Sequence, residues 1–408
     1  MLKNDALDII NAAIKASLPY EQTAKVLGGL KLPQSGITVF AIGKAAIPMA
    51  KAAADVLGGR IKTGLAVTKY GHTGDFSSEY FEVIEASHPV SDENSILAAE
   101  RALEISDSLT EKDTVVVLLS GGGSALFEKS AVPADLQRDI TKKLLARGAD
   151  IGEINALRRR LSLVKGGRFA ARCYPAEVIT LALSDVLSND KSVIASGITV
   201  PDTTSDSEVK RLADKYLYDI DSEELNVLYE KKELKINDGG YYFVGDINSL
   251  CGGALKKAEE LGYKAECVSR SLTGEARVRA VELLDGIAYE SGKRAYIWGG
   301  ETTVTLKGTG TGGRNQEMAL TAAITLRGAE HAVFASAGSD GTDGPTDAAG
   351  GIADGETFRK LKDMGIDPED ELDNNNSYFA LKNADALIIT GPTGTNVNDI
   401  TLILTDYE

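Results

Sequence analysis

Short apolar runs alternate with helical patterns along the first half of this chain. Alanine-rich stretches with apolar residues at helical spacing, such as Ala45 to Leu57 and Ser95 to Leu109, separate five runs of strand character. These runs are Ile37 to Ile42, Gly64 to Thr68, Phe81 to Ala86, Thr114 to Leu119 and Val178 to Leu183. The alternation predicts a doubly wound α/β domain, which binds ligands at the carboxyl ends of its strands.

A second alternating set begins after a charged region, Ser205 to Asn237, which we interpret as a connection between domains. Its strand-like runs are Tyr241 to Val244, Ala265 to Val268, Ala295 to Trp298, Thr302 to Leu306, Val333 to Ser336, Ala386 to Thr390 and Leu402 to Leu404. The threonine-rich run Thr302 to Leu306, followed by Gly308, predicts an inserted hairpin. Because 408 residues exceed the size of one typical core, we expect two domains, residues 1–235 and 236–408.

Composition limits the classes of partner. Sixty acidic against 44 basic residues give a net charge of −16, which argues against nucleic acid or an anionic membrane surface as a partner. Three widely spaced cysteines predict neither a disulfide framework nor a zinc site, and no apolar run reaches membrane-spanning length. We therefore expect a cytoplasmic protein, and the sequence leaves open whether it forms a homodimer.

The segment from Val115 to Leu126 carries the strongest functional signal. An apolar strand runs directly into a turn formed by Ser120, Gly121, Gly122, Gly123 and Ser124. Glycines let backbone amides approach a ligand closely, which is how proteins commonly hold phosphate groups. Further glycine-rich loops occupy residues 299–304, 308–317, 338–351 and 391–399. Several such loops in one chain favour a shared site.

Two basic side chains sit where helices are expected to start. Lys44 follows Gly43 between an apolar run and an alanine-rich stretch, and Arg314 lies between Gly313 and Asn315. A cation beside a helix N-terminus reinforces the attraction for anions, and a guanidinium can bind a carboxylate or phosphate at two points. An ordinary solvated surface position is the alternative for each residue.

Four aspartates, Asp340, Asp343, Asp347 and Asp354, follow the run Val333 to Ser336 at glycine-rich spacing. Magnesium typically uses one or two carboxylates together with substrate phosphates, whereas an aspartate can also take the proton from an attacking hydroxyl. Simple Asp-Gly turns would explain Asp343 or Asp347 taken singly. The spacing of an EF-hand calcium loop is missing.

Weaker candidates lie in three further segments. A basic helical stretch carries Asn155, Arg158 and Lys165, which is typical either of an anion site or of a charged helix face. Asp185 follows a strand in the loop SDVLSND, and Glu301 lies in the loop GGETTV. The three histidines show neither metal-ligand spacing nor a nucleophile partner, so we expect them to be structural.

Nucleotide-binding motifs are absent or out of context. The P-loop pattern GxxxxGK[ST] does not occur. A GxGxxG pattern occurs at Gly308, Gly310 and Gly313, but the acidic residue expected at the end of the next strand is missing, because Glu330 precedes that strand. The pattern therefore gives little support to a dinucleotide site.

Taken together, the motifs resemble those of the glycerate kinases that carry a MOFRL domain. They are GKA at Lys44, SGGGSAL at Ser120, the NxxRxxLSxxKGGR-like stretch from Asn155, SDV at Asp185, GGETTV at Glu301, GGRNQE at Arg314, GSDGTDG at Asp340 and GPTGTNVND at Asn396. The resemblance implies an N-terminal Rossmann-like domain, a C-terminal α/β MOFRL domain (about residues 294–404) and an active site in the cleft between them. The loop SDVLSND departs from relatives, which often have proline and glycine after the valine.

The resemblance also implies ATP as cosubstrate, Mg²⁺ as metal and D-glycerate as acceptor, with 2-phosphoglycerate favoured over 3-phosphoglycerate as product. It implies that Lys44, Arg314 and Asp340 line the site of phosphoryl transfer. Our hypothesis is that the glycine turn holds the ATP phosphates and that Asp340 orients or deprotonates the attacking hydroxyl. Asp185 and Asp340 are the candidate metal ligands, and Asp185 or Glu301 is the alternative metal ligand or base.

The remaining candidates are expected to bind substrate or nucleotide. They are Gly43, Ser120, Gly121, Gly122, Gly123, Ser124, Asn155, Arg158, Lys165, Asp185, Glu301, Gly313, Asn315 and Asp343. Two other functions stay open: an NAD(P)H-dependent hydroxypyruvate reductase, suggested by the GxGxxG pattern, and a non-catalytic nucleotide-binding protein. The presence of Lys44, Arg314 and Asp340 together argues against the second.

Overall fold

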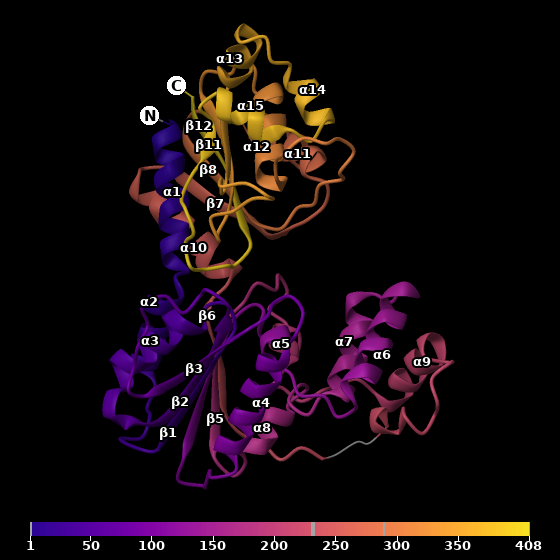
Figure 1. Cartoon of the computed structure of the whole chain (residues 1–408). Coiled ribbons are helices and arrows are strands. Elements are labelled where there is room, and N and C mark those ends of the chain that lie inside the picture. Colours follow the sequence, from indigo (N-terminus) through magenta and orange to yellow (C-terminus); the bar gives the residue numbers. More distant parts are fainter. Residues whose placement is uncertain (1, 230–232, 289, 408) are drawn as a thin grey trace. The chain divides into compact units, whose positions relative to one another are not determined.

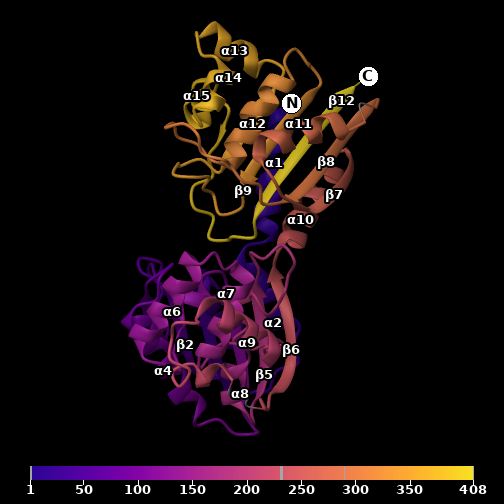
Figure 2. The same cartoon turned by 90° about the vertical axis from the view of Figure 1, so that its right-hand side faces the viewer.

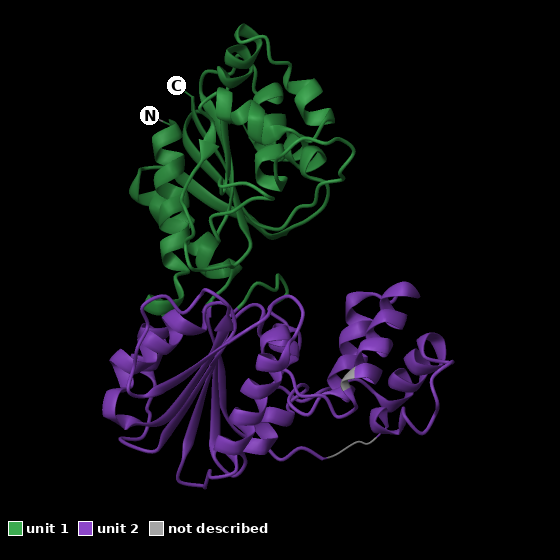
Figure 3. Cartoon of the chain, in the orientation of Figure 1, with its two compact units in different colours: residues 1–22, 184–188, 245–408 green, residues 23–183, 189–244 purple. Residues whose placement is uncertain are grey.

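The computed structural model describes residues 2–229, 233–288 and 290–407 (Figure 1). The chain divides into two compact units (Figure 3). Unit 1 comprises residues 1–22, 184–188 and 245–408, and unit 2 comprises residues 23–183 and 189–244. The predicted position of the active site, in a cleft between two domains, stays a prediction.

This division differs from the expected boundaries, 1–235 and 236–408, chiefly because the first helix belongs to the same unit as the C-terminal part of the chain. Helix α1 (Leu2–Ala16) buries an apolar face that packs against α10 (Ile247–Glu260) of unit 1. The helices meet closely at Gly253, where an added Cβ would lie 2.5 Å from the Cβ of Ala16. An amphipathic helix settles where its apolar face finds a partner, however far along the chain that partner lies.

Unit 2 is built on a six-stranded sheet with the order β3-β2-β1-β4-β5-β6, and β1 to β5 are parallel. The strands are β1 (Ile37–Ile42), β2 (Ile61–Lys69), β3 (Phe81–Ala86), β4 (Thr114–Leu119), β5 (Glu177–Leu183) and β6 (Asn237–Gly245). Every residue of β1 and β4 is buried, which explains their continuous apolar sequences. The strand order reverses between β1 and β4, and in such sheets ligands bind at the carboxyl ends of the strands beside the reversal. The doubly wound fold is thus confirmed.

Helices cover both faces of this sheet. Helices α2 and α3 lie on one face, and α4, α5 and α8 lie on the other (Figure 1). Their bounds are α2 (Pro19–Gly29), α3 (Ala46–Leu57), α4 (Glu93–Ser106), α5 (Gly123–Leu126) and α8 (Arg168–Cys173), with short 3₁₀ turns at Gly58–Arg60 and Ile194–Ser196.

The region Ser205 to Asn237 is not simply a connection between domains, as the sequence suggested. Helix α9 (Asp206–Tyr216) and a 3₁₀ turn (Asn226–Leu228) pack with α6 (Ala134–Ala146) and α7 (Ile151–Leu161) around a separate apolar core. That core includes Leu144 of α6 and Leu212 of α9. The charged residues of this segment dominate its composition, whereas its few apolar residues decide its packing. Residues 230–232 lie outside the described part of the chain.

Unit 1 contains a second six-stranded sheet with the order β11-β10-β9-β12-β8-β7. The strands are β7 (Lys264–Leu272), β8 (Gly292–Gly300), β9 (Ala332–Gly338), β10 (Gly350–Asp354), β11 (Leu387–Ile388) and β12 (Asp399–Tyr407). Strands β7 and β8 are parallel and the other pairs are antiparallel, with β12, β8 and β7 side by side in Figure 2. Sequence analysis missed β10, because its two glycines lack strand character.

The expected hairpin at Thr302 to Leu306 is wrong. The segment is irregular and pairs only through one isolated bridge, between Thr303 and Glu275. Helices α1 and α10 lie on one face of the sheet and α11, α12, α14 and α15 on the other (Figure 1). The bounds are α11 (Ala276–Gly286), α12 (Arg314–Thr325), α13 (Thr357–Asp363), α14 (Pro368–Asp373) and α15 (Ser377–Asn383). Among the described helices, none is long and apolar enough to cross a membrane.

The helical core of unit 2 can be tested with two adjacent leucines of α6. Leu144 is fully buried, whereas Leu145 is 63% exposed. We expect Leu144→Ala to lower the free energy of unfolding by about 2–5 kcal/mol, because the truncation leaves a cavity, and Leu145→Ala to change it by less than about 1 kcal/mol. Urea denaturation followed by circular dichroism measures both, and equal effects would contradict the packing described.

Candidate active site

The loops after β1 and β4 of unit 2 are joined by hydrogen bonds. The backbone N–H of Lys44 donates to the Gly121 carbonyl at 2.9 Å, and that of Ala45 donates to the Ser120 Oγ at 3.0 Å. Gly43 has a φ of +129°, and a Cβ there would lie 2.2 Å from the Ser120 Oγ, so only glycine fits. Ser120 is 1% exposed. Its hydroxyl therefore fixes the two loops to each other, and the geometry does not support the expected contact with a phosphate.

The glycine turn keeps backbone donors available. Gly121 and Gly122 are half-buried, and within the described part of the chain their N–H groups have no hydrogen-bond partner. The Lys44 side chain lies beside Gly122, since a Cβ on Gly122 would come 3.2 Å from the Lys44 Cγ. Gly123 is buried at the start of α5, and the Ser124 hydroxyl lies 2.6 Å from that of Ser196. Lys44 and the two free amides thus form a compact set of anion donors.

Lys165 occupies a different environment from the one expected. Its side chain is fully buried and pairs with the carboxylate of Glu128, which also accepts a hydrogen bond from Ser162 at 2.8 Å. Burial lowers the pKa of Lys165 to about 8. The geometry does not support direct contact with a dissolved substrate, and the pair instead anchors the chain just after α5. Arg158 lies 4.0 Å from Glu128, with Asn155 half-buried on the same helix, α7.

Arg314, at the start of α12 in unit 1, has the two-point geometry that the sequence predicted, but its partner is a protein carboxylate. Its Nε and Nη2 both donate to Asp399, the latter at 2.8 Å, and its Nη1 lies 3.2 Å from Glu301. Asp399 is 4% exposed, and its burial raises its pKa to about 6. About a third of the Arg314 side chain stays exposed, so the guanidinium still presents a face to a ligand.

Asp343 holds the first turn of α12. Its carboxylate is 2% exposed and accepts hydrogen bonds from the backbone N–H groups of Asn315 and Gln316, at 3.2 and 2.8 Å, and from both side-chain amides. A negative charge at a helix N-terminus is favourable, and here the protein itself supplies it. Gly313 permits the approach, since a Cβ there would lie 2.3 Å from Asp343. Asp343 and Asn315 are thus hydrogen-bonded to each other beside Arg314, and their expected role in binding substrate stays a prediction.

Asn398 joins three predicted loops of unit 1. Its Nδ2 donates to the Asp185 carbonyl at 3.0 Å and to Glu301 at 3.2 Å, and its own carbonyl accepts from the N–H of Ser339 at 3.0 Å. The next residue, Asp340, is half-buried and accepts hydrogen bonds from the N–H and hydroxyl of Thr342. The structure thus brings the loops of Asp185, Glu301 and Asp340 together. Sequence analysis did not single out Asn398 or Asp399, although both belong to the GPTGTNVND motif that it quoted.

A cavity of about 700 Å³ in unit 1 gathers four of the predicted residues, Glu301, Gly313, Arg314 and Asp343. Its apolar lining residues are Leu187, Val304, Leu306 and Pro345. Charged groups beside an apolar wall are typical of a small-molecule site. Within the described residues, three or more Asp, Glu, His or Cys side chains nowhere converge as a preformed metal site.

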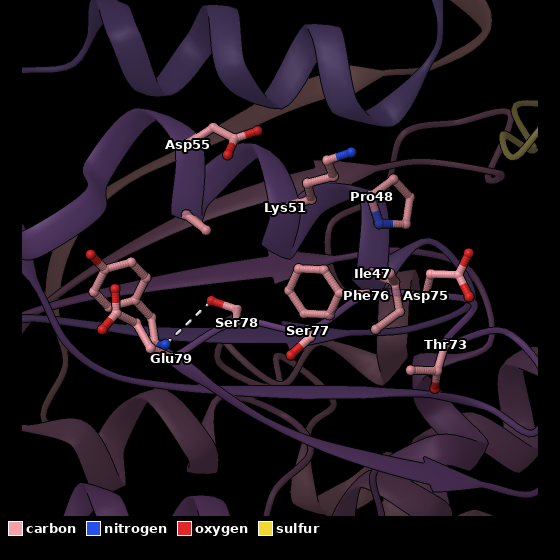
Figure 4. Close-up of a pocket in the computed structure, with 12 residues that line it drawn as sticks. Ile47, Pro48, Lys51, Asp55, Thr73, Asp75, Phe76, Ser77, Ser78 and Glu79 are labelled. Atoms are coloured by element: carbon pink, nitrogen blue, oxygen red, sulfur yellow. Dashed lines mark hydrogen bonds between the residues drawn. The ribbon is translucent and has the colours of Figure 1, made fainter.

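Unit 2 has a separate cavity of about 690 Å³ along the outer face of α3 (Figure 4). Ile47, Pro48 and Phe76 form an apolar part of its wall, and Lys51 and Asp55 of α3 add charge. None of the predicted site residues lines it.

These features define a two-unit α/β enzyme that handles small anionic molecules. Residues 5–228 match a family model described as a domain of unknown function (DUF4147), and residues 294–399 match the MOFRL family. The chain is 46% identical to D-glycerate 2-kinase of Thermotoga maritima, over 98% of this chain and 97% of that one. The chain therefore belongs to the MOFRL-domain glycerate kinase family.

Structure comparison gives the same result. A crystal structure of glycerate kinase from Thermotoga maritima matches with a TM-score of 0.93 and 45% sequence identity, covering 99% of each chain. A protein of Agrobacterium vitis named putative hydroxypyruvate reductase is 36% identical over 97% of this chain and 93% of its own length.

The anchoring role of Lys165 predicts a distinctive stability pattern. We expect Lys165→Met to lower the free energy of unfolding by about 3–5 kcal/mol, because it leaves the buried Glu128 carboxylate with the more distant Arg158, at 4.0 Å, as its remaining cation. The double variant Lys165→Met/Glu128→Gln should recover most of this loss. Urea denaturation at pH 7 measures all three proteins, and full stability of the single variant would contradict the assignment.

The burial of Lys165 beside Glu128 also predicts how the free energy of unfolding depends on pH. Because the pKa of Lys165 falls from 10.5 to about 8 on folding, the unfolded chain binds more protons between these values. The contribution of Lys165 to stability therefore rises with pH across that window, and the Lys165→Met variant should lose this rise. Comparing the two proteins from pH 7.5 to 10.5 isolates the effect from that of other titrating groups.

Proposed function

We propose that this protein is a glycerate kinase that transfers the γ-phosphoryl group of ATP to D-glycerate, giving ADP and 2-phosphoglycerate. The observation that carries the proposal is the 46% identity to D-glycerate 2-kinase over nearly the whole of both chains. The positions of Lys44, beside free glycine amides, and of Arg314, held in a fixed orientation, support it. The three free cysteines agree with action in a reducing cytoplasm.

Phosphoryl transfer depends on positioning and on positive charge around the transferred group. In unit 2, Lys44 and the N–H groups of Gly121 and Gly122 would contact phosphoryl oxygens. The bond between Ser120 and Ala45 keeps these donors in one arrangement, so they need no reorganisation when charge develops.

Unit 1 contributes the second positive group and the carboxylates. The exposed face of Arg314 would neutralise the glycerate carboxylate or the γ-phosphoryl oxygens, while Asp399 keeps the guanidinium from turning away. Asp340 would orient the attacking hydroxyl and accept its proton. Asp185 and Asp340, whose loops meet around Asn398, are the residues that would hold a magnesium ion with few protein ligands. Bound magnesium would neutralise charge on the phosphates.

The experiment that tests the proposal is phosphorus NMR of the products formed from ATP and D-glycerate with magnesium. We expect ADP and a single phosphomonoester resonance at the 2-position, which the three-bond coupling pattern distinguishes from the 3-position. Absence of glycerate-dependent ADP would exclude a kinase and favour a non-catalytic nucleotide-binding protein.

The hydroxypyruvate reductase alternative has one observation in its favour, the name of the Agrobacterium vitis relative. The structure argues against its nucleotide motif, because the amides of Gly308 and Gly310 are taken by Asn375 and Asn374, at 2.9 Å each. They are therefore not available to a pyrophosphate. Rapid oxidation of NADH in the presence of hydroxypyruvate would reinstate this alternative.

Removing either cation should slow the reaction. We expect Lys44→Ala and Arg314→Gln each to lower kcat/KM about 10²-fold or more, the effect of losing one preorganised charge-stabilising donor. Lys256→Ala is the matched control, since that ammonium is four-fifths exposed on α10. A coupled assay of ADP release measures all three, and thermal denaturation confirms that Arg314→Gln still folds despite the buried Asp399. Near-normal rates in both active-site variants would overturn these roles.

A further inference from the structure

His88 lies in a third loop beside the glycine turn of unit 2. The loop follows β3 and is held in place by two contacts: the Ser91 hydroxyl donates to the Ala125 carbonyl of α5 at 2.7 Å, and the Ser87 N–H donates to Asp92 at 3.2 Å. Asp92 in turn caps α4. The loop is therefore fixed both to the helix that follows the glycine turn and to its own supporting helix.

The imidazole of His88 faces the same glycine as Lys44. A Cβ on Gly122 would lie 3.0 Å from the His88 Cδ2, 3.3 Å from its Nε2 and 3.2 Å from the Lys44 Cγ. The Nε2 edge of the ring and the stem of Lys44 thus flank one Cα atom, in a backbone conformation (φ +85°) that favours glycine. A side chain at position 122 would separate the two groups.

Neither group is satisfied by the protein. Within residues 2–229, 233–288 and 290–407, the His88 ring and the Lys44 ammonium form no hydrogen bond or ion pair. Together with the free amides of Gly121 and Gly122, they make four donors or potential donors around one half-buried spot. Polar groups that a protein leaves unpaired in such a place are open to water or to a ligand.

The charged side chains that shift the pKa of His88 are positive. Burial first, and then the fields of Lys44 and Lys69, lower the pKa of His88 below its ordinary value. The carboxylate in its own loop, Asp92, is already engaged by Tyr70, Ser87 and Ser95. These effects favour the neutral imidazole in the free protein, and an arriving anion would oppose them.

We propose that His88 is a ligand of the phosphoryl group bound at the glycine turn, taking up a proton from solvent and donating Nε2–H to a phosphoryl oxygen. Its identity as a phosphate ligand rests on the geometry of unit 2. Only the source of that phosphate, ATP or phosphoglycerate, rests on the proposed function. This role replaces the structural one that the sequence suggested for all three histidines.

The consequence is a coupling between phosphate and proton binding. A dianion beside the ring raises the pKa of His88, so phosphate binding is accompanied by proton uptake. The contribution of His88 to phosphate affinity should then be largest below the pKa of the complex and should fall as the pH rises through it. Without His88, the second ionisation of phosphate itself still makes binding depend on pH near neutrality, so the contribution of His88 is the difference between the two proteins at each pH.

The test is NMR of the protein labelled with ¹³C in histidine. The chain has only His72, His88 and His331, so the variants His88→Asn and His72→Asn assign the three ring resonances. We expect saturating inorganic phosphate to raise the pKa of His88 by about 1 and to leave those of His72 and His331 unchanged. His88→Asn should weaken phosphate binding about tenfold at pH 6.5, and His72→Asn, which alters an exposed loop residue, should not.

Each outcome decides the proposal. An unmoved His88 resonance, or wild-type phosphate affinity in His88→Asn, would overturn it. Repeating the titration with ATP and with 2-phosphoglycerate identifies the source: a response to ATP alone places the donor phosphate at His88, and a response to 2-phosphoglycerate places the transferred group there. A shifted His88 in a protein without glycerate-dependent ADP formation would refute the proposed function and leave this inference intact.

Discussion

The close approach of two backbone loops is the constraint on which the candidate site of unit 2 depends. Parallel strands β1 and β4 end at the same edge of the sheet, and Gly43 lets the following loops come within hydrogen-bonding distance. The Ser120 hydroxyl then occupies the start of α3, where a ligand oxygen would otherwise bind. This arrangement leaves the Lys44 side chain beside Gly122 and the amides of Gly121 and Gly122 without a protein partner among the described residues. Binding to donors that are already oriented avoids the entropic cost of ordering them.

In unit 1, buried carboxylates limit the orientations of a positively charged side chain. Asp399 and Asp343 are almost fully enclosed, and each is satisfied by donors at the first turn of α12. Burying a carboxylate is costly unless it is paired, so these contacts leave Arg314 few alternative orientations. Two of the acidic residues of the chain thus lie around the start of α12, and one of them, Asp399, pairs directly with Arg314. A net charge of −16 is compatible with an anionic substrate because the positive groups are held locally.

In both units the predicted residues fall into two kinds, which differ in exposure. Lys44, Arg314 and Asp340 keep surface that a ligand can reach, whereas Ser120, Lys165, Asn315 and Asp343 are enclosed by protein partners. Motif residues of both kinds look alike in sequence, because a positioning residue and a contacting residue can have the same chemical type. Burial separates the two kinds in the structure, and the roles predicted for the second group stay predictions.

The sequence by itself determined the local features: the buried parallel strands, most helices, the glycine turn and the two cations, Lys44 and Arg314, where helices were expected to start. Their signals lie within a dozen residues, where hydrophobic period and glycine content act directly on the backbone. Tertiary structure alone decided which groups meet. The pairing of Arg314 with Asp399, of Lys165 with Glu128 and of α1 with α10 joins segments far apart in the chain, and no local pattern encodes a partner. His88 shows the same limit, because its relation to Lys44 exists only once β3 and β1 share a sheet.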